Sequence, residues 1–167
     1  MLSQDDVIEI SEDSNWSYRP DRQTAARMIR SLESGKVLYF PHLAFALKES
    51  ERRFLSPGCS DGKAKNVSYD PRNGSIQGTS CKDQDSNDLA AMISRFAAQA
   101  RALIESLFPH YTPHLEQART SYRPMPVQRR FRSVRKDDSR LHVDAFTSRP
   151  NQGKRILRVF TNVNPDG

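Results

Sequence analysis

The sequence predicts an α+β fold, with helices in the first part of the chain and strands in the last part. Residues 22–32 and 86–107 carry apolar side chains at helical spacing. From residue 119 onward, short arginine-rich runs contain β-branched and aromatic residues, and proline and polar residues interrupt them. The chain of 167 residues has 36% apolar content and shows no internal repeat. We therefore expect one domain with its own core.

The first helix has recognisable signals at both ends. Asp21 is placed to cap its start and Gly35 to stop it. The strand KVLYF follows at residues 36–40, and AFALKESERRFL at residues 44–55 predicts a second helix. The apolar stripe of the first helix consists of Ala25, Met28, Ile29 and Leu32.

A long polar stretch separates these elements from the second strong helix. Residues 56–88 hold four of the seven glycines, with many Ser, Asp and Asn, and we expect mostly loop there. Within this stretch NVSYDPRNGSIQG predicts a hairpin that turns at Asp70 to Gly74. The helix that begins at Ser86 ends before Pro109, and its stripe consists of Leu89, Met92, Ile93, Phe96, Ala100, Leu103 and Leu107.

Several protein classes are disfavoured by composition. The acidic N-terminus lacks the features of a signal peptide, and the longest apolar stretch, VLYFPHLAFAL, is too short to span a bilayer. We expect a soluble, cytoplasmic protein. Cys59 and Cys81 lack C-x-x-C spacing, which predicts free surface thiols and no structural zinc.

The basic charge of the chain is C-terminal. Residues 119–167 hold 12 Lys and Arg against 4 Asp and Glu, whereas residues 1–118 hold 14 against 16. Such a field attracts anions, either a phosphorylated or carboxylated substrate or a lipid head group, although a solvated strand face is the simpler interpretation. No nucleic-acid-binding signature accompanies the arginines, so we do not expect a nucleic-acid partner.

The stretch RLHVDAF suggests a metal site. In a strand, His142 and Asp144 leave the same face, as two ligands of a 2-His-1-carboxylate iron site would. A hydrogen-bonded His and Asp pair is the simpler alternative. His110 and His114 have metal-ligand spacing on a helix, but the prolines around them disfavour a regular helix. His42 has no partner nearby in sequence.

The flanks of this motif resemble a known family. The stretches ARTSYRP, SVRKDDSRLHVDAF and GKRILRVFTNVNPDG, together with GKVLYFPHLAF, FLSP, NVSYDP and LFPHYTPHLEQ, cover nearly the whole chain. They are similar to the 3-deoxy-D-manno-oct-2-ulosonic acid (Kdo) 3-hydroxylases, which are Fe(II)/2-oxoglutarate dioxygenases acting on lipopolysaccharide. The resemblance implies N-terminal helices followed by an incomplete double-stranded β-helix, or jelly roll. Residues 1–118 would form its helical and loop region and residues 119–167 its first strands, within one domain over residues 1–167.

The resemblance also implies the site residues. His142 and Asp144 match the first two iron ligands, and Asn162 matches a position that often touches 2-oxoglutarate. Arg158 lies on the same strand face as Phe160 and Asn162 and would be a second contact, unless it is a surface arginine. Arg135 and Lys136 would contact the anionic sugar acid, again with a solvated surface role as the alternative.

The resemblance implies cofactors and partners as well. Fe(II), 2-oxoglutarate and O2, with ascorbate as an aid, would hydroxylate the Kdo sugar at C3 in Kdo-lipid A. The basic C-terminal third favours peripheral contact with the anionic inner face of the inner membrane. The family's third iron ligand and its 2-oxoglutarate-clamping arginine would lie beyond Gly167, so we expect the N-terminal part of an enzyme, inactive alone. The alternatives are a 2-oxoglutarate oxygenase with another substrate and a non-catalytic basic binding fragment.

Overall fold

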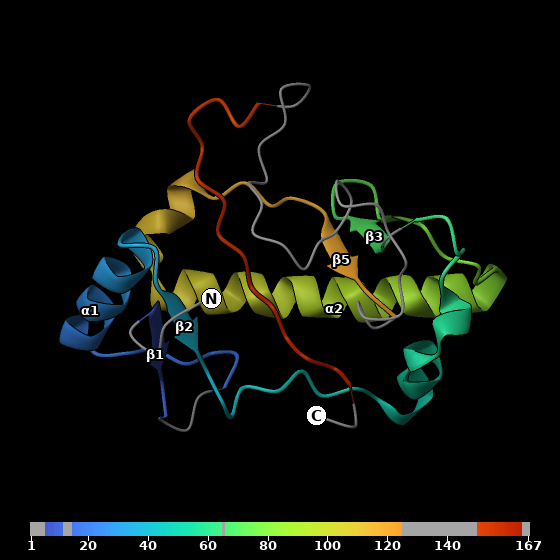
Figure 1. Ribbon diagram of the computed structural model, residues 1–167, viewed down its shortest axis with the longest axis horizontal. Coiled ribbons are helices and arrows are strands. Elements are labelled where there is room, and N and C mark those ends of the chain that lie inside the picture. Colours follow the sequence, from blue (N-terminus) through green and yellow to red (C-terminus); the bar gives the residue numbers. More distant parts are fainter. Residues whose placement is uncertain (1–5, 12–14, 65, 125–149, 165–167) are drawn as a thin grey trace.

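The computed structural model describes residues 6–11, 15–64, 66–124 and 150–164. These residues form an α+β fold, as predicted, built around one long helix that follows the long axis of the molecule (Figure 1). In chain order the elements, with 3-10 helices written as η, are β1 (Val7–Glu9), α1 (Arg22–Glu33), β2 (Val37–Tyr39), η2 (Glu49–Leu55), η3 (Pro57–Cys59), β3 (Val67–Asp70), β4 (Ser75–Gln77), α2 (Asp83–Leu107), η4 (Pro109–His114) and β5 (Thr120–Tyr122).

The capping signals of α1 are confirmed. Asp21 Oδ1 accepts hydrogen bonds from the backbone N–H groups of Gln23 at 2.8 Å and Thr24 at 3.0 Å. These bonds satisfy donors that the first helical turn leaves without partners. The helix ends at Glu33 with Ser34 as its C-cap, and Gly35 follows with φ of +86°, a conformation that glycine adopts without strain. On the predicted stripe, Met28 is fully buried.

Strand β1 was not predicted from the sequence. It pairs in parallel with β2, with Val7 opposite Val37 and Glu9 opposite Tyr39. Parallel neighbours need a crossover connection, and α1 supplies it. The unit β1–α1–β2 lies at the C-terminal end of α2 (Figure 1), where Leu103 and Leu107 pack with buried residues of this unit.

The predicted helix over residues 44–55 is wrong in its first half. Only η2, from Glu49 to Leu55, is helical, and it is a 3-10 helix. Backbone carbonyls before it are bonded to side chains from elsewhere: Trp16 Nε1 donates to the Ala44 carbonyl at 3.1 Å, and Arg95 Nη1 donates to the Ala46 carbonyl at 3.0 Å. These tertiary contacts therefore hold the segment in a non-helical conformation.

The predicted hairpin is present and belongs to a three-stranded sheet with the order β4–β3–β5. All neighbours in this sheet are antiparallel. The turn closes with a 2.9 Å hydrogen bond from Gly74 N–H to the Asp70 carbonyl. Strand β5 begins at Thr120, within the RTSYR run that predicted a strand.

Helix α2 begins three residues earlier than the sequence indicated, at Asp83, and contributes to two hydrophobic clusters. The first cluster consists of Phe45, Phe54, Cys59, Val67, Leu89, Met92, Ile93 and Tyr122. The second cluster consists of Ile10, Met28, Leu103, Leu107 and Phe108. Pro109 ends the helix, as predicted, and η4 follows.

Two further predictions, for residues 154–163 and for Cys59, are wrong. The strand predicted over KRILRVFTNV is not paired with any other described segment, and side chains anchor it instead. Lys154 forms an ion pair with Glu116 at 2.5 Å, and Val163 packs against the first cluster. The alternation expected for this stretch does hold from Val159 to Asn164, where every second side chain is less exposed. Cys59, expected at the surface, is buried because it belongs to the first cluster.

Candidate functional site

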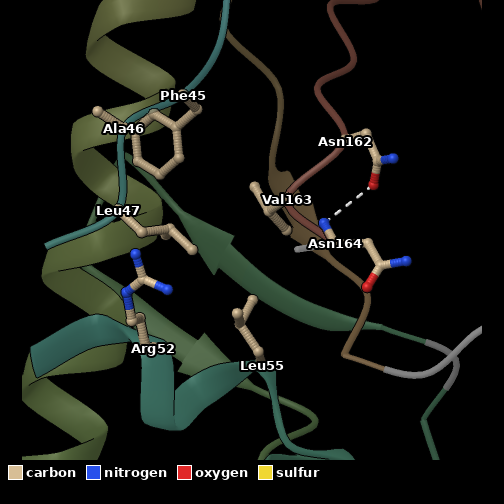
Figure 2. A pocket seen from close by; sticks show the side chains of 8 residues that line it. All are labelled: Phe45, Ala46, Leu47, Arg52, Leu55, Asn162, Val163 and Asn164. Atoms are coloured by element: carbon tan, nitrogen blue, oxygen red, sulfur yellow. Dashed lines mark hydrogen bonds between the residues drawn. The ribbon is translucent and has the colours of Figure 1, made fainter. Parts of the chain in front are cut away.

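Asn162 lines a cavity of about 320 Å³ between two distant parts of the chain. Figure 2 shows one wall formed by residues 45–55 and the opposite wall formed by residues 162–164. Val163 belongs to the lining and packs against the cluster that contains Phe45. The complete lining is Phe45, Ala46, Leu47, Arg52, Leu55, Asn162, Val163 and Asn164.

The cavity combines polar donors with apolar walls. Asn162 Oδ1 accepts a 3.0 Å hydrogen bond from the Asn164 backbone N–H, which fixes the orientation of the Asn162 amide. On the other wall, Arg52 Nε lies 2.9 Å from Glu49 Oε2. A guanidinium and two amides above aliphatic and aromatic side chains can bind a carboxylated or hydroxylated small molecule.

The position of Arg52 follows from its neighbour in η2. Glu51 is buried, and its carboxylate accepts hydrogen bonds from the Lys48 backbone N–H at 2.8 Å and from Arg95. The Arg95 guanidinium also lies 4.2 Å from the centre of the Phe45 ring, a cation–π contact. With Glu51 directed inward, Arg52 faces the cavity. The sequence carries no local signal for Arg52, because its place across from Asn162 depends on segments that are far apart in the chain.

A second polar cluster fixes the chain just before the region of the predicted iron ligands. The Asp70 carboxylate is nearly inaccessible and contacts Arg72 at 2.7 Å and Arg119 at 3.2 Å. Hydrogen bonds from the Arg72 side chain and backbone, followed by the charges of both arginines, lower the pKa of Asp70 far below its ordinary value of 3.8. Arg119 directly precedes β5, so this carboxylate fastens the sheet at the entry to residues 125–149.

Strand β5 is also held by two further contacts. The buried Tyr122 hydroxyl donates a 2.7 Å hydrogen bond to the Phe54 carbonyl, and Arg123 Nε donates to Asn66 Oδ1 at 2.9 Å. Burial and, to a smaller extent, the nearby Cys59 raise the pKa of Tyr122 to about 12. The phenol therefore remains protonated and keeps its donor role at all ordinary pH values.

Comparison with known proteins gives this geometry a context. The family model for 3-deoxy-D-manno-oct-2-ulosonic acid (Kdo) hydroxylase matches residues 15–167. The chain belongs to the Kdo hydroxylase family. No curated protein sequence matches it.

Solved structures of a Kdo hydroxylase resemble the chain closely. The structure of KdoO, described as a non-heme Fe(II) alphaketoglutarate-dependent dioxygenase, in complex with cobalt(II) has a TM-score of 0.90 and 44% sequence identity. The match covers 97% of this chain and 54% of that chain. KdoO in complex with alphaketoglutarate and Fe(III) has a TM-score of 0.88 and 43% identity, over 96% of this chain and 53% of that one. This Kdo hydroxylase family member thus spans about half the length of these relatives.

Of the predicted site residues of this family member, only Asn162 and Arg158 lie in the part of the chain that the structure describes. His142, Asp144, Arg135 and Lys136 lie outside the described residues, and their roles stay predictions. Arg158 is exposed and is not among the residues that line the cavity with Asn162. Within the described ranges, no group of three or more His, Cys, Asp and Glu side chains could hold a metal ion. In the same ranges, no helix is long and apolar enough to cross a membrane.

Proposed function

We propose that this chain supplies the iron-binding pair and the N-terminal body of an enzyme that hydroxylates the Kdo sugar of Kdo-lipid A at C3, with Fe(II), 2-oxoglutarate and O2. The observation that carries this proposal is the 44% identity and TM-score of 0.90 with KdoO over 97% of the chain. The H-x-D pair at His142 and Asp144 adds a donor set of imidazole and carboxylate, which suits Fe(II). Residues 119–167 would contribute the first strands of a double-stranded β-helix.

The metal and its co-substrate, when bound, would supply the oxidising chemistry of the reaction. The residues of this chain would bind and orient. His142 and Asp144 would hold the metal, and a second histidine ligand would not come from residues 145–167, which contain no histidine. Asn162, supported by its place in the cavity opposite Arg52, would contact 2-oxoglutarate, with Arg158 as a second contact.

Substrate contact would involve the basic part of the chain. Arg135 and Lys136 would attract the carboxylate of the sugar acid, and the 12 Lys and Arg of residues 119–167 would favour a peripheral position at the anionic inner face of the inner membrane. Contacts of this kind weaken with salt. Binding of Kdo-lipid A should therefore fall as ionic strength rises.

A fusion protein tests the function. In the fusion, these 167 residues are joined to the half of KdoO that the match does not cover. We expect succinate release that requires Fe(II), 2-oxoglutarate and Kdo-lipid A, whereas the 167 residues alone should release none above a no-protein control, because coupled catalytic groups are missing. In the fusion, His142→Ala should abolish turnover and the matched control His110→Ala should retain it. Turnover that survives His142→Ala, or that another acceptor stimulates and Kdo does not, would overturn the proposal.

A further inference from the structure

The two cysteines of the chain, 22 positions apart in sequence, meet beside the start of α2. Cys59 is the last residue of η3 and is 7% exposed. Cys81 lies two residues before α2, is partly buried, and packs against the same hydrophobic cluster to which Cys59 belongs. Both are free thiols in this structure. The fold has therefore brought the whole cysteine content of the protein to one place.

The backbone around the two residues fixes their proximity. The Cys59 carbonyl accepts hydrogen bonds from Thr79 Oγ1 at 2.8 Å and from the Ser80 N–H at 3.3 Å. The Cys81 N–H donates to the same Thr79 Oγ1 at 3.1 Å. An antiparallel bridge between Ser60 and Thr79 holds the two segments together. One threonine hydroxyl thus connects both cysteine backbones. The two cysteines are therefore held near each other by hydrogen bonds to their backbones, and not by their side-chain rotamers alone.

The two thiols have different environments. Burial raises the pKa of Cys59 to about 11, and the adjoining Cys81 thiol adds to the increase through a hydrogen bond and its charge. Cys59 is therefore protonated near neutral pH and a poor nucleophile. Its sulfur also lies 3.9 Å from the Arg53 carbonyl. The more accessible Cys81 is the thiol that a small oxidant meets first.

We propose that Cys59 and Cys81 are a modification site, a dithiol that a low-molecular-weight disulfide converts reversibly into an intramolecular disulfide. The Cys81 thiolate attacks one sulfur of the small disulfide, forms a mixed disulfide and releases one small thiol. Cys59 then gives up its proton, and its thiolate attacks Cys81 Sγ and releases the second small thiol. The protein loses two electrons and two protons, and the small disulfide is reduced to two thiols.

The new bond would fasten two segments that backbone hydrogen bonds and Thr79 already hold together. It would tie η3 to the start of α2, which η2 already contacts through the ion pairs of Arg53 with Asp85 at 3.0 Å and with Asp88. It would also close a loop around the β3–β4 hairpin. Closing this loop restricts the unfolded chain more than the folded one, so oxidation should stabilise the protein.

Mass spectrometry of the folded chain after incubation with glutathione disulfide tests the proposal. We expect the wild type to lose two hydrogens, to carry no glutathione and to become resistant to iodoacetamide, with dithiothreitol reversing all three changes. The melting temperature should rise by on the order of 5 °C in the oxidised form.

Two variants separate the steps. Cys59→Ser should retain glutathione at Cys81, because no second thiol resolves the mixed disulfide, and Cys81→Ser should react slowly or not at all. The proposal is overturned if the wild type accumulates the same glutathione adduct as Cys59→Ser, if it forms only dimers linked between chains, or if both cysteines stay open to iodoacetamide. None of these readouts depends on the iron site.

Discussion

The part of the molecule built around α2 and the segment of residues 150–164 are held in different ways. In the α2 part, residues 15–124, large apolar side chains such as Phe54 and Phe108 are 1% exposed. In residues 150–164, Ile156, Leu157 and Phe160 are 52%, 41% and 81% exposed. The α2 part is stabilised by buried apolar contacts, whereas the later segment is held by the ion pairs of Lys154 with Glu116 and Arg155 with Glu33 and by the packing of Val163. Apolar residues in the two parts should therefore respond differently to substitution.

The largest effect should come from a core phenylalanine. Phe54→Ala removes a ring that is 1% exposed in the first cluster and that the Arg53 guanidinium covers at 4.6 Å. We expect a loss of about 3–5 kcal/mol in the free energy of unfolding, because the cavity cannot fully collapse. Urea denaturation measures it. The matched control is Phe160→Ala, which should cost less than about 0.5 kcal/mol. Equal losses would show that residues 150–164 are as firmly packed as the α2 part.

An intermediate effect should come from the buried ion pair beneath the cavity. The Glu51 side chain is 8% exposed and that of its partner Arg95 is 27% exposed, so Glu51→Gln leaves a largely desolvated cation without its counter-charge. We expect a loss of about 2–3 kcal/mol by urea denaturation. Glu49→Gln is the control, because its pair with Arg52 is exposed, at 90% and 61%, and should contribute about 0.5 kcal/mol or less. If Glu51→Gln left the free energy of unfolding unchanged, other groups would be stabilising the Arg95 charge.

The smallest effect should be a pH dependence at the β3–β5 junction. The pKa of Asp70 is lowered in the folded state, so the unfolded state binds more protons once the pH falls below the ordinary value of 3.8. The stabilisation is complete above that pH and is lost as the pH falls toward the folded-state pKa. The melting temperature of the wild type should exceed that of Asp70→Asn at pH 7, and the gap should narrow between pH 4 and pH 2.

The control for this titration is Phe160→Ala, which changes no ionisable group. The difference between its melting temperature and that of the wild type should be the same at every pH. A constant gap between Asp70→Asn and the wild type down to pH 2 would show that the Asp70 interactions do not depend on its charge.

Local signals predicted much of the fold. The caps of α1, the Asp70 to Gly74 turn and the amphipathic stripe of α2 depend on neighbouring residues, and all three are present. Elements that depend on distant partners were missed. Strand β1 has three residues and exists because β2 pairs with it, and residues 44–48 are not helical because Trp16 and Arg95 bind their carbonyls. Cys59 is buried by residues far away in sequence.

The candidate site also contains one residue that could be predicted and one that could not. Resemblance to a family pointed to Asn162, and the structure places it at a cavity. Arg52 across that cavity could not be predicted, because nothing in the sequence states that η2 and residues 162–164 face each other. The strand predicted over residues 154–163 has the right alternation in its second half, but pairing needs a neighbouring strand, and the described residues provide none there.

The course of α2 through both hydrophobic clusters has a consequence for how the protein opens. Leu89 and Met92 belong to the first cluster, and Leu103 and Leu107 belong to the second, while the Trp16 ring packs against both. A fluctuation that separates the helix from one cluster also loosens the other, because residues of the same continuous helix belong to both clusters. The amides in the middle of α2 should therefore exchange with deuterium only through global unfolding, as one cooperative unit, while those of residues 150–164 exchange through local motions.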